Sequence, residues 1–213
     1  MEKSKEFSIT ISRQLGSGGA YIGQQLAKKL EIFYADREII DRVATQYAIL
    51  EEDVVSNDEK ILSFWESFLQ FNTISTDMYV PPKLLAPTDR ELFQAEAGII
   101  EHIVNERSAV IIGRCGSYIL RDYPENVSIF LHGDTATRKK RIRNLYHVTE
   151  EAAENMIEQS DKERARYCRI VTGKKWGWND ARNYNLSIDT SKLDIDNCIE
   201  LILEYLNFND IKL

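Results

Sequence analysis

Short runs of apolar residues recur along the chain and are separated by longer amphipathic stretches. Near-continuous apolar runs occupy residues 109–112 and 127–131, and weaker runs occupy residues 7–12, 32–34 and 185–188. Runs of this length are typical of strands in a parallel sheet that is covered on both faces. The pattern therefore predicts five strands.

Between these runs the apolar positions repeat every three to four residues, as they do in helices with one buried face. Ile22, Leu26 and Leu30 form one such stripe, and residues 195–206 form another, which Asp194 is placed to cap. Strands that alternate with helices predict a doubly wound α/β fold, a parallel five-stranded sheet with helices on both faces. Ligands of such folds bind at the carboxyl ends of the strands.

Residues 39–107 interrupt this alternation. They contain two apolar helix faces, separated by a segment that carries Pro81, Pro82 and Pro87. Because proline ends or kinks helices, that segment is interpreted as a loop or hinge. We interpret the whole stretch as a helical insertion over the sheet.

The composition is ordinary for a globular protein, with 43% hydrophobic and 29% charged residues among 213. No apolar run approaches the roughly 18–20 residues that a membrane span needs, and the opening residues lack the apolar core of a signal peptide. We therefore expect a cytoplasmic protein without membrane contact. Cys115, Cys168 and Cys198 form no CxxC pair and are expected to be reduced, and with the three histidines they show no metal-ligand spacing.

Charge is unevenly distributed along the chain. The net charge of −7 argues against a general nucleic-acid binder. Residues 138–175 nevertheless hold eleven Lys or Arg against six Asp or Glu, whereas residues 44–97 hold three against ten. A basic island in an acidic protein favours a small polyanionic ligand such as a nucleotide. The alternative is a solvated helix face.

Residues 9–23 read ITISRQLGSGGAYIG, a strand that leads through a glycine-rich turn into a helix. This layout is typical of a phosphate-binding loop, because glycine lets the backbone approach an anion and the helix start directs its dipole at it. The alternative is a tight turn that binds nothing. The candidate phosphate-binding residues are Gly16, Ser17, Gly18, Gly19 and Ala20.

This loop lacks two groups of a full Walker A loop, GxxxxGK[ST], which places a lysine on the terminal phosphates and a hydroxyl on Mg²⁺. No lysine follows the glycines, and Ala20 or Tyr21 stands where the hydroxyl belongs. Arg13, just before the glycines, can supply the missing charge, although its planar guanidinium is not a point charge. Arg13 can equally be a surface arginine. Ser12 or Ser17 remains as an indirect contact for Mg²⁺.

Further candidate residues follow the second and third predicted strands. Asp36 and Arg42 flank a helix start six residues apart and can converge on one ligand, or they can be a helix cap and a solvated arginine. Arg114 leaves the end of a buried strand, where active sites of α/β proteins lie. Cys115 beside it is interpreted as a small filler, since no histidine is close in sequence.

The basic island contains a series of arginines, several of which share a helix face by their spacing. Phosphoryl transfer needs such groups, because its catalysis consists mainly of positioning and of neutralising charge on the phosphoryl oxygens. The alternative is surface pairing with the glutamates of the same region. The arginines are Arg138, Arg141, Arg143, Arg164, Arg166 and Arg169.

In this order the motifs resemble the cytidylate kinase-like branch of the P-loop nucleoside monophosphate kinases, over essentially the full chain. That family has an Asp and an Arg six residues apart after strand two, a GRD tripeptide, an RAxRR-like helix start, a DxxR lid segment and a closing IDTS. The matching positions are Asp36 with Arg42, Arg114 in a GRC tripeptide, Arg138 with Arg141, Asp161 with Arg164 and nearby Arg166, and residues 188–191.

The resemblance implies one kinase-like domain over residues 1–213, in which residues 39–107 bind the acceptor and residues 143–180 form a basic lid. It implies an ATP- and Mg²⁺-dependent phosphotransferase that acts on a nucleoside monophosphate such as CMP, binds small nucleotides and is compatible with a homo-oligomer. Its catalytic residues would be Arg13, Arg138, Arg141, Arg164 and Arg166, and its acceptor-binding residues Asp36, Arg42 and Arg114.

Two departures from the family pattern leave alternatives open. The Walker lysine is absent, and Cys115 replaces the Asp of GRD, which weakens the case for cytosine selectivity. One alternative is a non-catalytic nucleotide-binding or regulatory protein that kept the kinase fold. Another is a kinase for a different small acceptor, with a pocket reshaped by the acidic insertion.

Overall fold

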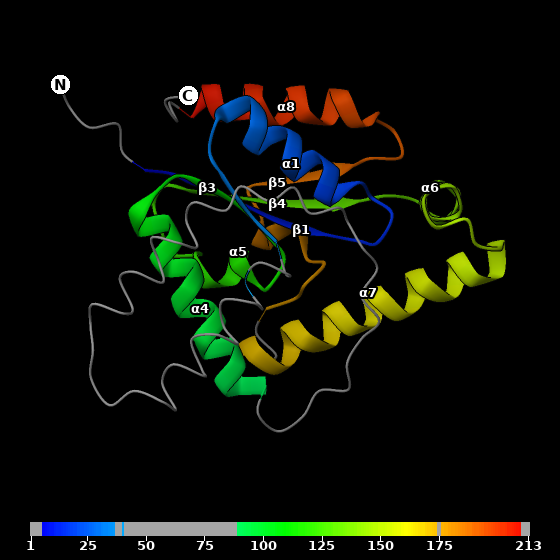
Figure 1. The fold of residues 1–213 in the computed structure, drawn as a ribbon, viewed down its shortest axis with the longest axis horizontal. Helices are drawn as coiled ribbons and strands as arrows, with labels where there is room; N and C mark the ends of the chain where they lie inside the picture. Colours follow the sequence, from blue (N-terminus) through cyan, green and yellow to red (C-terminus); the bar gives the residue numbers. More distant parts are fainter. Residues whose placement is uncertain (1–5, 37–39, 41–88, 174–175, 210–213) are drawn as a thin grey trace.

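The structure, a computed structural model, describes residues 6–36, 40, 89–173 and 176–209. Its centre is a parallel five-stranded sheet with the strand order β2-β3-β1-β4-β5 (Figure 1). All five predicted strands are confirmed, with ends that differ by one residue at most. The strands are β1 (Ser8–Arg13), β2 (Phe33–Ala35), β3 (Ala109–Ile112), β4 (Asn126–His132) and β5 (Leu186–Asp189).

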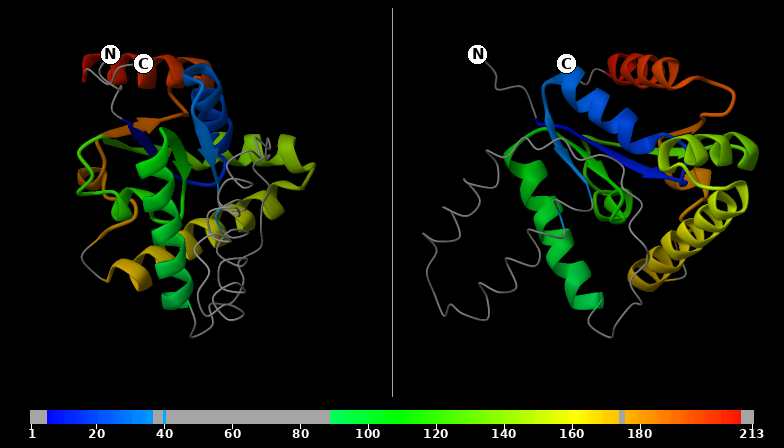
Figure 2. Two further views of the ribbon diagram at one scale, coloured as in Figure 1. Left: turned by 60° about the vertical axis from the view of Figure 1, so that its left-hand side comes forward. Right: turned by 45° about the vertical axis from the view of Figure 1, so that its right-hand side comes forward.

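Helices cover both faces of the sheet, as the doubly wound prediction requires. Helices α1 (Gly19–Leu30) and α8 (Ile195–Phe208) pack on one face, and α4 (Asp89–Glu106) and α5 (Gly116–Ile119) lie on the other (Figures 1 and 2). Asp194 caps α8 by accepting a hydrogen bond from the Asn197 N–H, as expected. None of the helices in the described part of the chain is both long and apolar enough to cross a membrane.

Alternating positions of β1 divide the interior into two layers. Ile9 and Ile11 are buried and join the cluster formed with α1 and α8. Thr10 points the other way and is also fully buried, where its hydroxyl oxygen accepts a hydrogen bond of 3.0 Å from Ser117 of α5. By the same alternation Arg13, the last residue of β1, is on the face of Ile9 and Ile11, which α1 covers.

Two helices extend from the edge of the sheet at which the strands end. They are α6 (Thr135–Tyr146) and α7 (Glu150–Thr172), and α7 runs back from this edge toward α4 (Figure 2). A small core joins the pair to the glycine loop, because Leu15 is buried against Ile142, Ala153 and Ile157. The predicted insertion lies largely outside the described residues, and the lid boundaries remain a prediction. A short helix, η1 (Ala181–Asn183), precedes β5.

Candidate active site

The glycine loop is a closed, rigid turn between β1 and α1. Gly16 and Gly18 take φ values of 81° and 82°, a left-handed conformation that favours glycine. Within the turn the buried Ser17 donates to the Gln14 carbonyl from both its N–H (3.3 Å) and its hydroxyl (2.8 Å). Helix α1 starts at Gly19, and Gly18 caps it without any side chain. The N-terminus of α1 can therefore receive an anion on its backbone N–H groups.

We expect Gly16→Ala to destabilise the protein by about 1–2 kcal/mol, the usual cost of a left-handed non-glycine residue. A Cβ at Gly16 would also lie 2.9 Å from the carbonyl oxygen of Arg138. Urea unfolding measures the loss. The control is Gly98→Ala, which lies in α4 with nothing within 4 Å of the new Cβ and should be neutral or stabilising. Equal unfolding midpoints for the two variants would contradict the prediction.

The side chain of Arg13 lies across the start of α1, in the space that a lysine at residue 19 would need. A Cβ built on Gly19 would lie 2.6 Å from Cγ and 2.8 Å from Cβ of Arg13. The guanidinium continues to the end of β3, where its Nη1 would collide with a Cβ on Gly113. Arg13 therefore stretches from the glycine loop to the turn that carries Arg114. The glycine at residue 19 is what makes this path available.

Three of the predicted arginines bind backbone carbonyls of the loop or of Arg13, the strand residue just before it. Nη1 of Arg164 donates to the carbonyl of Arg13 (3.0 Å), and Nη1 of Arg138 donates to that of Leu15 (3.3 Å). Nη1 of Arg141 lies 3.4 Å from the Gly16 carbonyl. Helices α6 and α7 thus contact the loop through its backbone carbonyls. The arginines fix the shape of the loop and bring positive charge next to it.

Arg138 and Arg141 also have partners outside the loop. Arg138 is only 6% exposed and forms an ion pair of 2.6 Å with Asp161, a carboxylate that also accepts a hydrogen bond of 3.0 Å from the Leu15 N–H. Arg141 donates to the hydroxyl (2.9 Å) and the carbonyl (2.6 Å) of Thr190, after β5. These contacts lock α6, α7 and the end of β5 to the loop.

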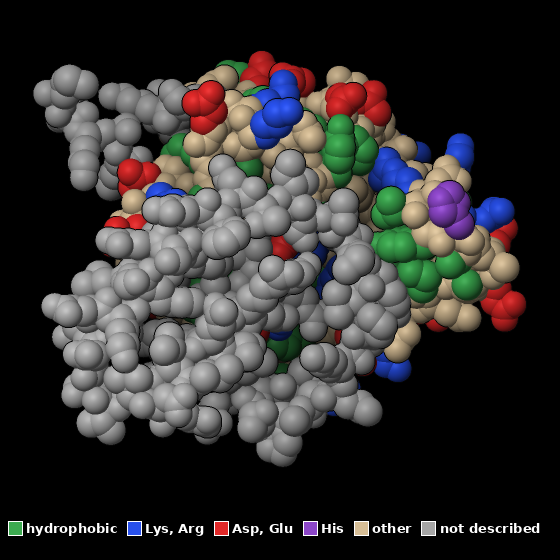
Figure 3. All heavy atoms as spheres, viewed as in Figure 1, with side chains coloured by type: hydrophobic (Ala, Val, Ile, Leu, Met, Phe, Trp, Pro, Cys, Tyr) green, Lys and Arg blue, Asp and Glu red, His purple; other side chains and the backbone are tan. Residues whose placement is uncertain are grey.

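Three other charges of the basic island, among its described residues, follow the alternative interpretation, surface pairing on helices. Arg166 is about half exposed and pairs with Glu163 at 3.7 Å, away from the loop. Lys139 lies 3.3 Å from Glu150, and Arg143 pairs with the same glutamate at 3.6 Å. Basic and acidic side chains are intermixed over the visible surface of the described residues (Figure 3).

Arg114 is one of the three residues that the sequence predicts to bind the acceptor. It has a left-handed backbone, with a φ of 49°, directly after β3, and its side chain is 10% exposed. Its Nη1 lies 3.1 Å from a carboxylate oxygen of Glu96. Asp36 follows β2, the neighbour of β3, at the same edge of the sheet. Arg42 lies outside the described residues.

The surroundings of Cys115 disfavour its thiolate form. Contact with the Cys168 thiol, followed by burial, holds the pKa of the Cys115 thiol well above its ordinary value. A thiol with a raised pKa stays protonated at neutral pH, and the thiolate is the reactive form. This environment fits the interpretation of Cys115, which is partly buried, as a small filler.

Sequence reasoning missed three functional neighbours of these arginines: Glu96, Asp161 as a loop anchor, and Thr190. Glu96 had a recognisable signal, because it is a charged residue beside the apolar helix face that contains Ile99 and Ile100. The structure shows that it is fully buried. A buried carboxylate needs a partner. Asp161 and Thr190 belonged to recognised motifs, but their contacts depend on how distant elements meet.

Known proteins resemble this chain over most of its length. The model of the cytidylate kinase-like family matches residues 8–192. The chain belongs to this family. A cytidylate kinase of Shouchella clausii is 24% identical over 221 residues, 94% of this chain and 96% of that protein. A cytidylate kinase of Saccharolobus islandicus is 28% identical over 109 residues, 51% of this chain and 56% of that protein.

Among solved structures, a crystal structure of an uncharacterized protein from Eubacterium ventriosum covers 95% of this chain and 99% of its own, with a TM-score of 0.70 and 25% identity. Together with the sheet order, the family match confirms a P-loop fold of the nucleoside monophosphate kinase type. Membership of the cytidylate kinase-like family supports a kinase-type enzyme that binds small nucleotides.

Proposed function

We propose that this member of the cytidylate kinase-like family transfers the γ-phosphoryl group of ATP to a nucleoside monophosphate, with CMP as the first candidate. The observation that carries the proposal is the path of Arg13, whose side chain crosses the start of α1 and reaches the turn at Gly113. A cation on this path lies between the donor loop and the acceptor side. That is where a phosphoryl group in transfer needs neutralisation.

In the proposed mechanism the loop residues from Gly16 to Ala20 hold the donor phosphates through backbone N–H groups and the dipole of α1. Arg13 takes the place of the missing lysine. Arg138 and Arg141 hold the loop in shape, while Arg164 brings further positive charge from α7. Arg166, which pairs with Glu163 at the surface, is given no role in the transfer. No general base is required, because an acceptor phosphate is already anionic at neutral pH.

On the acceptor side, Asp36, Arg42 and Arg114 would seat the nucleoside monophosphate. Arg114 would bind its phosphate, because guanidinium groups form paired hydrogen bonds with phosphate oxygens. CMP is the first candidate because the Asp36, Arg42 and Arg114 positions match the family pattern and because the Shouchella clausii relative is a cytidylate kinase. The neutral Cys115 in place of an aspartate leaves room for another base.

The loop does not fit a directly bound Mg²⁺. Ala20 has no side-chain oxygen at the position of the usual hydroxyl, and the Ser17 hydroxyl is fully buried within the turn, where it donates to the Gln14 carbonyl. Among the described residues, no three His, Cys, Asp or Glu side chains gather in a way that could hold a metal ion. We therefore assign Mg²⁺ no protein ligand and derive no step through it.

A coupled assay that measures ADP release from ATP tests the proposal across the common nucleoside monophosphates. We expect ADP release that depends on the acceptor, and fastest turnover with CMP. ADP release without any acceptor dependence would argue against phosphoryl transfer to a nucleotide. Turnover with another monophosphate would keep the reaction and change its substrate.

The rival function is a nucleotide-binding module without catalysis, and the lack of a hydroxyl at Ala20 favours it. Isothermal titration calorimetry separates the two functions when combined with the assay. Tight ATP binding without turnover on any acceptor would support the module. Turnover that is lost in Arg13→Ala, while ATP binding remains, would support the enzyme.

A further inference from the structure

Three elements that are distant in sequence meet at the side chain of Arg114. Nη1 of Arg114 lies 3.1 Å from Oε1 of Glu96, which belongs to α4. The hydroxyl of Tyr167, from α7, donates a hydrogen bond of 2.7 Å to Oε2 of the same carboxylate. The guanidinium carbon of Arg114 also lies 5.6 Å from the centre of the Tyr167 ring. Glu96, Arg114 and Tyr167 therefore form one connected set of contacts.

This set is strongly constrained by burial. The side chain of Glu96 is 0% exposed and that of Arg114 is 10% exposed. Removing a charge from water is costly unless its partners compensate for it, so the pair holds a defined geometry. Burial, reinforced by the negative charge of Glu96, raises the pKa of the Tyr167 hydroxyl well above its ordinary value. Tyr167 therefore remains a hydrogen-bond donor across the physiological pH range.

We propose that Glu96 and Tyr167 are positioning residues, which aim Arg114 at the acceptor phosphate and tie its position to helix α7. The inference rests on the proposed function. One oxygen of Glu96 fixes Arg114 and the other fixes Tyr167, so a movement of α7 changes the support of Arg114. Because α7 also carries Asp161 and Arg164, which contact the glycine loop, the same helix connects the donor side with the acceptor side.

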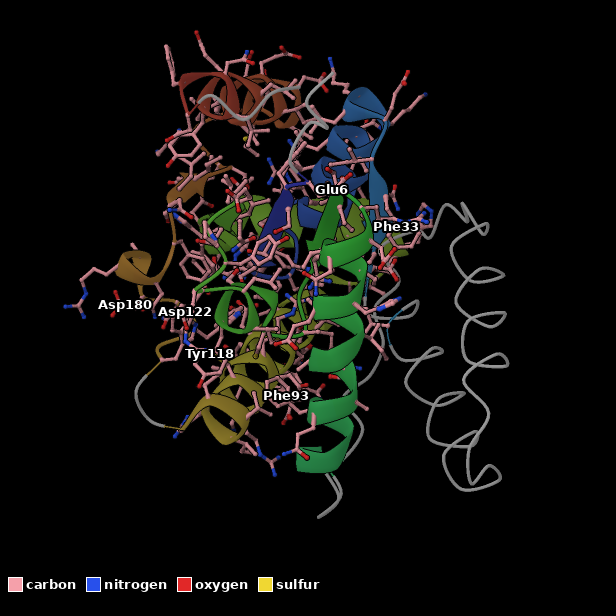
Figure 4. All side chains as sticks on the ribbon, turned by 90° about the vertical axis from the view of Figure 1, so that its left-hand side faces the viewer. Glu6, Phe33, Phe93, Tyr118, Asp122 and Asp180 are labelled. Carbon is pink, nitrogen blue, oxygen red and sulfur yellow. The ribbon has the colours of Figure 1, made fainter. Side chains whose placement is uncertain are left out.

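Helices α4 and α7 also meet through an apolar contact, which provides a matched control. Phe93, labelled on α4 in Figure 4, meets the ring of Tyr167 edge-on, with ring centres 6.3 Å apart. It takes no part in the polar set. Phe93→Leu weakens the packing between α4 and α7 and leaves the three polar groups in place. It reports what a purely structural loss at this interface does.

The test compares Tyr167→Phe, Glu96→Gln and Phe93→Leu by their KM for CMP, their KM for ATP and their thermal unfolding. Tyr167→Phe keeps the ring over Arg114 and removes only the hydrogen bond to Glu96. We expect it to raise the KM for CMP about tenfold, the effect of losing one hydrogen bond to a charged group, with the KM for ATP nearly unchanged. Glu96→Gln should act in the same direction, and Phe93→Leu should lower the unfolding temperature without changing either KM.

Two results overturn the inference in distinguishable ways. If the wild type phosphorylates a nucleoside monophosphate and Tyr167→Phe changes only the unfolding temperature, as Phe93→Leu does, the positioning role is wrong while the proposed function stands. If the wild type neither binds CMP in calorimetry nor releases ADP with any nucleoside monophosphate, the proposed function fails and the inference fails with it. A selective rise in the KM for the acceptor supports both.

Discussion

Replacing Arg13 by alanine is expected to lower kcat about 10²- to 10³-fold, the usual effect of removing one group that stabilises charge in a transition state. The KM for ATP should change less, because the backbone N–H groups of the loop remain. The reason is the path of the side chain, which passes over Gly19 and ends at Gly113. No other residue of the loop carries a positive charge. The coupled assay with CMP measures the loss.

The control for this variant is Arg121→Ala. Arg121 stacks on Tyr118, with its guanidinium carbon 4.4 Å from the ring centre, and pairs with Asp122 at 3.2 Å, away from the glycine loop. The variant Arg121→Ala should leave kcat unchanged. Activity of Arg13→Ala within threefold of the wild type would remove the catalytic role of Arg13.

A second test of the role of Arg13 replaces this arginine by the lysine of a full Walker A loop. The variant Arg13→Gly/Gly19→Lys/Ala20→Ser turns residues 13–20 into GQLGSGKS, which satisfies the full Walker A pattern. We expect it to recover most of the activity that Arg13→Gly loses. Gly19→Lys alone should not help, because its Cβ collides with the retained Arg13. If the triple variant stays as inactive as Arg13→Gly, the arginine and the lysine are not interchangeable in this fold.

The fold was largely predictable because it depends on local patterns. Buried strands such as residues 109–112 are apolar at every position, so their composition identifies them without any partner. The glycine loop was recognised by its place between a strand and a helix. The stripe of Ile22 and Leu26 likewise gave the buried face of α1. Only the ends of the strands shifted, by one residue at most.

The contacts of the arginines were less predictable, since they depend on how α6 and α7 dock on the loop. Spacing gave Arg138 and Arg141 a shared helix face. It could not reveal that Arg138 would be buried against Asp161, or that Arg141 would bind Thr190. Arg166 belongs to the same basic stretch of sequence, yet it faces the surface. A charge pattern identifies candidates, and tertiary packing selects among them.

Asp161 provides the other large expected effect, on stability. Its carboxylate pairs with Arg138 at 2.6 Å, and the two side chains are 17% and 7% exposed. It also accepts a hydrogen bond from the Leu15 N–H at 3.0 Å. Asp161→Ala should destabilise the protein by about 3–5 kcal/mol, because removal of one partner leaves a buried charge uncompensated. Chemical denaturation with a two-state fit measures this loss.

A double variant separates the charge from the loop anchor. In Arg138→Met/Asp161→Asn no guanidinium remains without a partner, and the asparagine oxygen can still accept from the Leu15 N–H. We expect the double variant to be more stable than Asp161→Asn alone, since a buried ion pair contributes little compared with apolar packing of similar volume. Glu200→Gln, which breaks the exposed pair with Lys29 at 3.0 Å, should cause no measurable loss. If Asp161→Asn is as stable as Glu200→Gln, the carboxylate does not hold α7 to the glycine loop, and Arg164 together with the packing of Leu15 on Ala153 and Ile157 holds it instead.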